Sequence, residues 1–404
     1  MASGNKRIGM GLVGPGFIAQ HHIDAVRRLN FVDLIGLAGS SQASAAKAAQ
    51  SFGVPHAFGT YEELIADPRI DVVHNTTPNY LHHPVSLAAL RAGKHVVSDK
   101  PLALNSAECS ELAEAARQAG VVNAVTFNYR GNPLVQEARA RIRNGDLGEL
   151  SFIHGQYLQD WMADDRVYSW RSDPAKGGAS SALADIGSHW CDLAEYMSGA
   201  KIVSVLAEVT TVIGTRYTTG ASAKAFETVS NAELHPVTVT GEDLATVLLR
   251  FSNGARGSMT VGQVMPGHKN DLQIEINGRK ASLRWLQERQ NELWIGHDKR
   301  ANEVLAKDPS LLTPEARAYA HLPGGHQESW ADAFRNIIAD IYAAVEIAVQ
   351  SRDEPKIQAS ADSSTQRSST VCTFADAAHT VAVIEAMLAS AAAGGVWQMV
   401  EQVQ

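Results

Sequence analysis

The sequence predicts two domains of different class: a doubly wound α/β domain with a parallel sheet, then an α+β domain with a large, mostly antiparallel open sheet flanked by helices. Short apolar runs alternate with helical patterns as far as Phe127, which is typical of the first class. Longer strand-like runs separated by turn residues follow Tyr129, which is typical of the second. A length of 404 residues suits two or three domains, and we place the boundary between 1–128 and 129–404.

In the first domain, strands are recognised as short apolar runs and helices by apolar residues at every third or fourth position. The predicted strands are Arg7–Val13, Val32–Ala38, Val72–Asn75, His95–Ser98 and Val122–Phe127. The predicted helices are Phe17–Leu29, Ser44–Phe52, Tyr61–Ala66, Pro84–Ala92 and Ser106–Ala119. Because parallel strands need crossovers that cover both faces, this alternation predicts a Rossmann domain.

The second domain combines strands with helices near its start and end. The predicted strands are Leu150–Gln159, Ile202–Ile213, Leu244–Phe251, Ala255–Val264, Leu272–Asn277 and Ala281–Trp285, and the predicted helices are Leu134–Asn144, Glu328–Gln350 and Phe374–Ala393. Ser252-Asn253-Gly254 and Asn277-Gly278 are hairpin turn signals. The polar, Ser-rich segment 351–370 is predicted to be a loop. An open antiparallel sheet leaves one face to be covered, so we expect a homodimer or homotetramer.

Composition excludes several classes of protein. With 45% hydrophobic residues the chain is not intrinsically disordered, and its formal net charge of −8 argues against a general nucleic-acid binder. We find no run of about 18 uncharged apolar residues, so no membrane span is expected. The three cysteines are scattered and make no disulfide framework or zinc motif. The N-terminus lacks the pattern of a signal peptide, so we expect a cytoplasmic protein.

A glycine-rich turn follows the first predicted strand. Gly9, Gly11 and Gly14 match the dinucleotide fingerprint by spacing, but Gly9 and Gly11 fall inside the strand. The register that suits the physics is Gly14 for the tight turn, Gly16 for approach to a pyrophosphate, and the small Ala19 for helix packing. The helix that follows would offer its N-terminal N–H groups to the phosphates.

The end of the second strand bears on the choice of cofactor. An NAD site usually has Asp or Glu there, to bind the ribose hydroxyl, and this chain has neither. Ser40, Ser41 and Lys47 are available to a 2′-phosphate, although no Arg accompanies them. We therefore expect NAD or NADP, with a slight preference for NADP.

Six segments carry a resemblance to a known family. They are Gly14 to His22 (GPGFIAQHH), Thr77 to His82 (TPNYLH), Ala92 to Pro101 (AGKHVVSDKP), Asn128 to Arg130 (NYR), Gly145 to Gly148 (GDLG) and Asp185 to Asp192 (DIGSHWCD). In this order they resemble the motifs of the glucose-fructose oxidoreductase/inositol dehydrogenase (Gfo/Idh/MocA) family of NAD(P)-dependent sugar dehydrogenases. One departure is Asp99, where the family usually has Glu.

The resemblance implies hydride transfer between nicotinamide and a secondary hydroxyl of a sugar, sugar derivative or cyclic polyol. It implies that His189 is the general acid/base, that Lys100 stabilises the reacting oxygen, and that Asp185 binds or orients a substrate hydroxyl. Spacing agrees in part, because Asp185 and His189 are four residues apart and share one face of a helix. Lys100 follows a buried strand at the carboxyl edge of the sheet, where ligands bind in such folds.

The remaining candidates fall into cofactor and substrate groups. Cofactor contacts are expected from Gly14, Gly16, Phe17, Ile18, Ser40, Ser41, Thr77, Pro78, Asn79, His82, Asp99, Lys100 and Asn128, and His22 is expected to line the same region. Substrate contacts are expected from Lys100, Arg130, Trp161, Trp170, Arg171, Asp185, His189 and His326, because aromatic faces stack on sugar rings and charged groups bind hydroxyls.

Two alternatives to a dehydrogenase use parts of the same sequence. A metal site at His189, Cys191 and Asp192 is disfavoured, because offsets of two and three residues do not converge on one helix face. A regulatory protein of the same fold, which senses dinucleotide without turning over a substrate, stays open. The presence of both Lys100 and His189 favours the enzyme.

Overall fold

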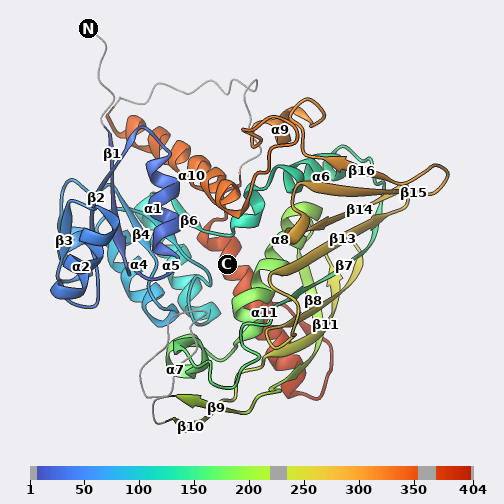
Figure 1. Ribbon diagram of the computed structural model, residues 1–404, viewed down its shortest axis with the longest axis horizontal. Coiled ribbons are helices and arrows are strands. Elements are labelled where there is room, and N and C mark those ends of the chain that lie inside the picture. The colour runs from blue at the N-terminus through green and yellow to red at the C-terminus, as the bar shows by residue number, and fades with distance from the viewer. Residues whose placement is uncertain (1–6, 219–233, 354–369, 402–404) are drawn as a thin grey trace. The chain divides into compact units, whose positions relative to one another are not determined.

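The computed structural model describes residues 7–218, 234–353 and 370–401 (Figure 1). The N-terminal residues 1–6 and most of the Ser-rich segment predicted as a loop lie outside the described residues. The chain forms two compact units. The first comprises Met1–Ala103, Ala107–Gly131 and Trp330–Ala377, and the second comprises Leu104–Ser106, Asn132–Ser329 and Ala378–Gln404.

The first unit is built on a six-stranded parallel sheet in the order β3-β2-β1-β4-β5-β6. Its strands are β1 Ile8–Val13, β2 Val32–Ala38, β3 His56–Phe58, β4 Val72–Asn75, β5 His95–Ser98 and β6 Asn123–Val125. The predicted Rossmann fold is confirmed. The chain leaves β1 on one side for β2 and β3 and returns on the other side for β4, so the carboxyl ends of β1 and β4 form the switch point where ligands bind in such sheets.

Helices cover this sheet between its strands. They are α1 Ala19–Arg27, α2 Gln42–Phe52, α3 Tyr61–Ala66, α4 His82–Arg91, α5 Ser106–Ala119 and α10 Trp330–Asp353, with 3-10 turns at Asn79–Leu81 and Asn128–Gly131. Local chemistry sets several ends: Ser41 and Thr60 cap α2 and α3 through their hydroxyls, and the left-handed Gly53 ends α2. The helices predicted in this part of the chain are all present.

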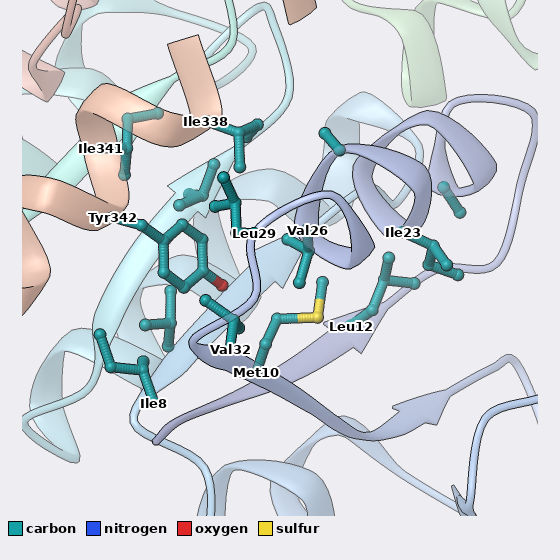
Figure 2. Close-up of a cluster of buried hydrophobic side chains, with 14 of the residues drawn as sticks. Ile8, Met10, Leu12, Ile23, Val26, Leu29, Val32, Ile338, Ile341 and Tyr342 are labelled. Atoms are coloured by element: carbon teal, nitrogen blue, oxygen red, sulfur yellow. The ribbon is translucent and has the colours of Figure 1, made fainter. Parts of the chain in front are cut away.

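A buried apolar cluster holds β1, α1 and α10 together (Figure 2). Figure 2 labels Ile8, Met10, Leu12, Ile23, Val26, Leu29, Val32, Ile338, Ile341 and Tyr342. This packing explains why 330–377 belongs to the first unit, which differs from the single boundary expected at 128. The approach of α10 is close, since a Cβ on Gly131 would lie 2.1 Å from the carbonyl oxygen of Ala333.

The second unit contains a nine-stranded sheet in the order β16-β15-β14-β13-β7-β12-β11-β8-β17. Its strands are β7 Leu150–Leu158, β8 Ile202–Thr210, β11 Leu244–Phe251, β12 Arg256–Gly262, β13 Asp271–Gly278, β14 Ala281–Leu286, β15 Glu292–His297, β16 Glu303–Ala306 and β17 Gln398–Met399. Only β7 and β12 pair in parallel, so the predicted mostly antiparallel sheet is confirmed. A separate ribbon pairs β9 Thr215–Thr218 with β10 His235–Thr238.

Helices α6 and α8 pack against one face of this large sheet. The helices of this part of the chain are α6 Pro133–Arg143, α7 Pro174–Gly177, α8 Ser188–Ser198, α9 Pro314–Arg317 and α11 Phe374–Ala392, with 3-10 turns at Trp170–Ser172 and Gln287–Arg289. Among the described residues, α11 alone is long and apolar enough to span a bilayer, but 56% of that window is buried within the protein. Its His379 also lies 2.9 Å from Glu195. These features suit a core helix.

Candidate active site

The glycine turn after β1 has the geometry that a pyrophosphate site needs. Gly14 has φ +90°, and a Cβ there would lie 2.7 Å from the Thr77 backbone, so only glycine fits. A Cβ on Gly16 would meet nothing within 4 Å, which leaves its outer side open. Gly9 and Gly11 lie inside β1, as the chosen register requires.

The carboxyl end of β4 is organised by two polar side chains. Asn75 accepts a 2.7 Å hydrogen bond from the Thr77 hydroxyl and donates to the carbonyl of His82 and the hydroxyl of Ser86. His82 is buried, with Nδ1 2.6 Å from the Pro101 carbonyl and Nε2 2.8 Å from the Thr77 carbonyl. Burial lowers the pKa of His82, although Asp99 opposes this effect. His82 thus connects the loop after β4 to the loop after β5.

Asp99 and Lys100 follow β5 directly. Asp99 Oδ1 accepts hydrogen bonds from the Lys100 backbone N–H at 2.9 Å and the Thr126 hydroxyl at 3.0 Å. Asp99 is one carbon shorter than the Glu of the resembled motif, and its carboxylate still accepts from two nearby donors. It fixes the backbone from which the half-buried Lys100 side chain extends.

The other candidates of the first unit occupy different environments. Phe17 is exposed, and Ile18 precedes α1 without capping it through a side chain. Ser40 is exposed, whereas the Ser41 hydroxyl already caps α2. Arg130 is buried and donates to the carbonyl of Val371, which occupies part of its guanidinium. The remaining candidates lie on the loops that follow β4 and β6: Pro78, the buried Asn79 and the buried Asn128.

In the second unit, Asp185 and His189 lie on consecutive helical turns. Asp185 is part of a π-helical turn, Leu183–Gly187, that leads directly into α8, and His189 is a buried residue in the first turn of α8. π-Helical turns occur often at functional sites, because they shift side chains out of the regular helical register. The ring of His189 lies 6.4 Å from that of Tyr157, measured between centroids.

Arg171 brings the aromatic candidates together with Asp185. Its guanidinium carbon lies 4.5 Å from the ring centroid of Trp170 and 6.0 Å from that of Trp161. Its Nε lies 3.8 Å from Oδ1 of Asp185. Two indole faces, a cation and a carboxylate therefore meet in one place, which is a combination suited to a polyhydroxylated ring.

A chain of hydrogen bonds extends from Trp161 towards the helix of His189. The Trp161 indole donates to Gln159, and the Gln159 amide and the Tyr157 hydroxyl both donate to Asn270 Oδ1, at 3.0 and 2.6 Å. Tyr157 lies in β7, Gln159 and Trp161 follow that strand, and Asn270 directly precedes β13. The hydrogen bonds fix the orientation of Trp161 and Tyr157.

His326 precedes α10 in the sequence. It lies in an exposed loop, with Nδ1 3.4 Å from the Gly324 carbonyl. Among the described residues, no hydrogen bond links His326 to Asp185 or Arg171, and its contact with the substrate stays a prediction. The metal alternative gains no support either: among the described residues no group of three His, Cys, Asp or Glu is placed to hold an ion, and burial raises the pKa of Cys191 well above its usual value.

Comparison with known proteins assigns the family. Residues 8–127 match the model of an oxidoreductase family with an NAD-binding Rossmann fold, and residues 135–284 match the GFO/IDH/MocA C-terminal domain. A levoglucosan dehydrogenase from Pseudarthrobacter phenanthrenivorans is 33% identical over 299 residues, which cover 72% of this chain and 76% of the relative. The chain belongs to the Gfo/Idh/MocA family.

Two solved structures match nearly all of the chain. A levoglucosan dehydrogenase in complex with NADH and L-sorbose superposes with a TM-score of 0.84 at 27% identity, covering 98% of this chain and all of the other. An inositol dehydrogenase homologue from Azotobacter vinelandii, complexed with NAD+, has a TM-score of 0.83 at 25% identity over 98% of this chain and 97% of the other. The protein is an NAD-binding oxidoreductase of the Gfo/Idh/MocA family.

The residues of the first unit fit the dinucleotide that the family uses. Gly16 leaves room beside the backbone, and no side chain caps the start of α1. The buried Nδ2 of Asn128 lacks a hydrogen-bond partner among the described residues, which is costly unless a ligand or solvent accepts from it. The phosphate-binding turn and this amide give the first unit two features that suit a bound dinucleotide.

Sequence reasoning missed several residues of this Gfo/Idh/MocA site. Asn75 and Gln263 hydrogen-bond the candidates Thr77 and Asp185, and Asn270 and Glu242 hydrogen-bond Tyr157 and Ser181. Asn75 had a usable signal, because it ends β4 at the switch point. The others are single polar residues at strand ends, and no spacing distinguishes them from ordinary turn residues.

Proposed function

We propose that this protein is a dehydrogenase that oxidises a secondary hydroxyl of a sugar, sugar derivative or cyclic polyol with NAD(P). The observation that carries the proposal is the group formed by Arg171, Trp170, Trp161 and Asp185 beside the helix of His189. Indole faces suit the apolar face of a sugar ring, and the charged pair suits its hydroxyls. The names of the relatives point to the same substrate class.

In the proposed reaction, His189 takes the proton of the substrate hydroxyl. The carbon that bears this hydroxyl gives up its hydrogen as a hydride. An imidazole suits this role, because its unperturbed pKa of about 6.5 lies close to working pH. Lys100 donates a hydrogen bond to the oxygen as negative charge develops there. Asp185 accepts from a neighbouring hydroxyl and holds the ring in place. The dinucleotide, when bound, supplies the nicotinamide carbon that receives the hydride.

For the cofactor, we propose NAD or NADP, with a slight preference for NADP. No carboxylate is present between Ala38 and Ser44 to repel a 2′-phosphate, and Ser40 and Lys47 are exposed. The slight preference for NADP expected from the sequence remains a proposal, and the complexes of the relatives name NADH and NAD+. The ratio of kcat/KM for the two dinucleotides tests it.

We propose that the open face of the nine-stranded sheet pairs with a second copy of the chain. Leu248, Phe152 and Met399 share this face by strand register and are 46%, 38% and 70% exposed. A homodimer or homotetramer would cover them. Sedimentation equilibrium of the wild type and of Leu248→Arg tests this, because a charge on the face should shift the molecule towards monomer.

We propose a cytoplasmic enzyme with no nucleic-acid or membrane partner. All three cysteines are buried and none is in a disulfide, which suits a reducing compartment. The net charge of −8 suits neither nucleic acid nor an anionic lipid surface. Fractionation of cells that express the full chain tests this location.

The decisive test of function is a reduction screen. NAD and NADP are each offered with pyranosides, anhydrosugars, inositols and disaccharides, and the oxidised product is identified by mass spectrometry and NMR. The proposal expects at least one sugar or polyol to be oxidised at a secondary carbon. Tight dinucleotide binding with no oxidation across the panel would instead favour the regulatory protein that senses dinucleotide.

A further inference from the structure

The end of the β11–β12 hairpin lies against the turn that carries Asp185. Leu244 pairs with Gly262, so the residues just outside this pair, Glu242 and Gln263, sit at the same end of the hairpin. Both are buried, and the Gln263 backbone N–H donates to the Asp243 carbonyl at 2.9 Å. A Cβ on Gly241 would lie 3.0 Å from the Ser181 side chain, so the hairpin and the turn are in close contact.

Glu242 holds the beginning of the turn through one oxygen atom. Its Oε1 accepts hydrogen bonds from the Ser180 hydroxyl at 2.7 Å and from the Ser181 and Leu183 backbone N–H groups, both at 2.9 Å. The Glu242 carbonyl accepts from the Ala182 N–H at 3.0 Å. Burial raises the pKa of Glu242, while these donors oppose the rise. These bonds supply acceptors to N–H groups at the start of the helix, which have no acceptor within the helix.

Gln263 holds Asp185 itself. The Gln263 amide Nε2 donates to Asp185 Oδ2 at 2.7 Å. Arg171 lies on the other carboxylate oxygen, with Nε 3.8 Å from Oδ1. The Gln263 amide is neutral, so it fixes one oxygen without changing the net charge of Asp185. Because Arg171 lies on the other oxygen, the plane of the carboxylate is set from two sides.

From these contacts we propose that Glu242 and Gln263 are positioning residues for the reaction, which orient Asp185 and His189 by clamping residues 180–187 to the β11–β12 hairpin. The inference rests on the proposed function, since it assigns Asp185 and His189 to the substrate. Neither Glu242 nor Gln263 needs to touch the sugar. Their effect passes through the π-helical turn, whose side-chain directions depend on where its first residues are fixed.

The chemistry of the clamp defines the variants. Glu242→Gln keeps an acceptor oxygen at the Oε1 position and replaces Oε2 with a neutral NH2 group, whereas Glu242→Leu removes the acceptor of three hydrogen bonds. Gln263→Leu removes the donor to Asp185. Glu137→Leu is the matched control: Glu137 is also a buried carboxylate with three donors, but they come from Thr313 and Arg141.

Two readouts separate positioning from general destabilisation. For Glu242→Leu we expect kcat/KM to fall about tenfold or more, since unpaired N–H groups displace the turn, with Glu242→Gln within about threefold of wild type. Gln263→Leu should raise KM more than it lowers kcat, because Asp185 acts in binding. The Kd for NADH should stay within about twofold in all of them, since the dinucleotide turn lies in the first unit.

Hydrogen–deuterium exchange of peptides that span 180–187 gives a test independent of turnover. Exchange should rise in Glu242→Leu but stay as in wild type in Glu242→Gln and Glu137→Leu. Wild-type kcat/KM in Glu242→Leu and Gln263→Leu, or unchanged exchange in Glu242→Leu, would overturn the inference. If Glu242→Leu fails to fold, Gln263→Leu and the Glu242→Gln comparison carry the test. A wild type that oxidises no sugar contradicts the proposed function, and exchange alone then decides whether the clamp exists.

Discussion

His22 Nδ1 lies 2.8 Å from His74 Nδ1, and both imidazoles are completely buried. His22 belongs to α1, directly after the dinucleotide turn, and His74 to β4. The other nitrogen of His74 lies 3.0 Å from the Tyr342 hydroxyl of α10. One Nδ1–H donates to the lone pair of the other Nδ1, so the contact is lost when both rings are protonated.

The histidine pair predicts loss of stability in acid. Burial lowers the pKa of His22 to about 4 and that of His74 well below its usual value. Because the folded-state pKa lies below the unfolded value of about 6.5, the unfolded chain binds more protons between about pH 6.5 and pH 4. The free energy of unfolding should fall by about 3 kcal/mol over this window through His22 alone. Denaturant titrations along a pH series measure the fall.

The control for this prediction is a neutral replacement. His22→Asn keeps a polar group near the Nδ1 position but cannot be protonated, so its stability should fall less steeply in acid. His326→Asn, on an exposed loop, serves as the matched control. An acid slope that is the same in His22→Asn and wild type would contradict the prediction.

The two glycines of the dinucleotide turn should respond differently to alanine. Gly14→Ala forces a Cβ into the Thr77 backbone at φ +90°, so we expect a loss of about 1–3 kcal/mol in stability. Gly16→Ala meets no protein atom, so Tm should stay near wild type while the Kd for NADH rises about tenfold, because the methyl lies where the pyrophosphate approaches.

Thermal unfolding and fluorescence titration with NADH measure these two effects. Gly214→Ala is the matched control, since a Cβ at Gly214 also meets nothing within 4 Å. It should change neither Tm nor the Kd. Unaltered NADH binding in Gly16→Ala would show that the pyrophosphate lies elsewhere.

Arg171 should matter through its flat shape as well as its charge. Arg171→Lys keeps the charge near Asp185 but cannot stack on Trp170, so KM for the sugar should rise about 2- to 30-fold. Steady-state kinetics measure the rise. Arg284→Lys is the control, because Arg284 also stacks on a tryptophan, Trp294, beside a carboxylate, Glu275. Equal KM values in both variants and wild type would remove Arg171 from the sugar site.

Much of the first unit could be predicted because buried parallel strands read as continuous apolar runs. Strands such as β2, β4 and β5 were predicted to the residue. The edge strand β16 and its neighbour β15 were missed; β16 is mostly exposed and has no apolar alternation. The assignment of α10 to the first unit depends on long-range packing against α1, which no local pattern reports.

The candidate site also contains residues that the sequence predicts and residues that it does not. Lys100, Asp185 and His189 stand in motifs and could be proposed from sequence, whereas Gln263 is 78 residues from the Asp185 that it holds. Glu242 is 61 residues from Ser181. Contacts of this kind follow from sheet register, so they appear only once β11 and β12 are paired. Asp99 departs from the Glu that is usual in the family motif, and the sequence alone does not explain this. In the structure, its hydrogen bond from Thr126 does.

The central claim is that Lys100 and His189 act chemically on a sugar hydroxyl. It is tested most directly by measuring kcat/KM for the identified substrate in wild type, Lys100→Met and His189→Asn, together with the Kd for NADH. The account predicts that each variant loses about 10²–10⁴-fold in kcat/KM, and that His189→Asn binds NADH within about twofold of wild type. Turnover by both variants at the wild-type rate would contradict it.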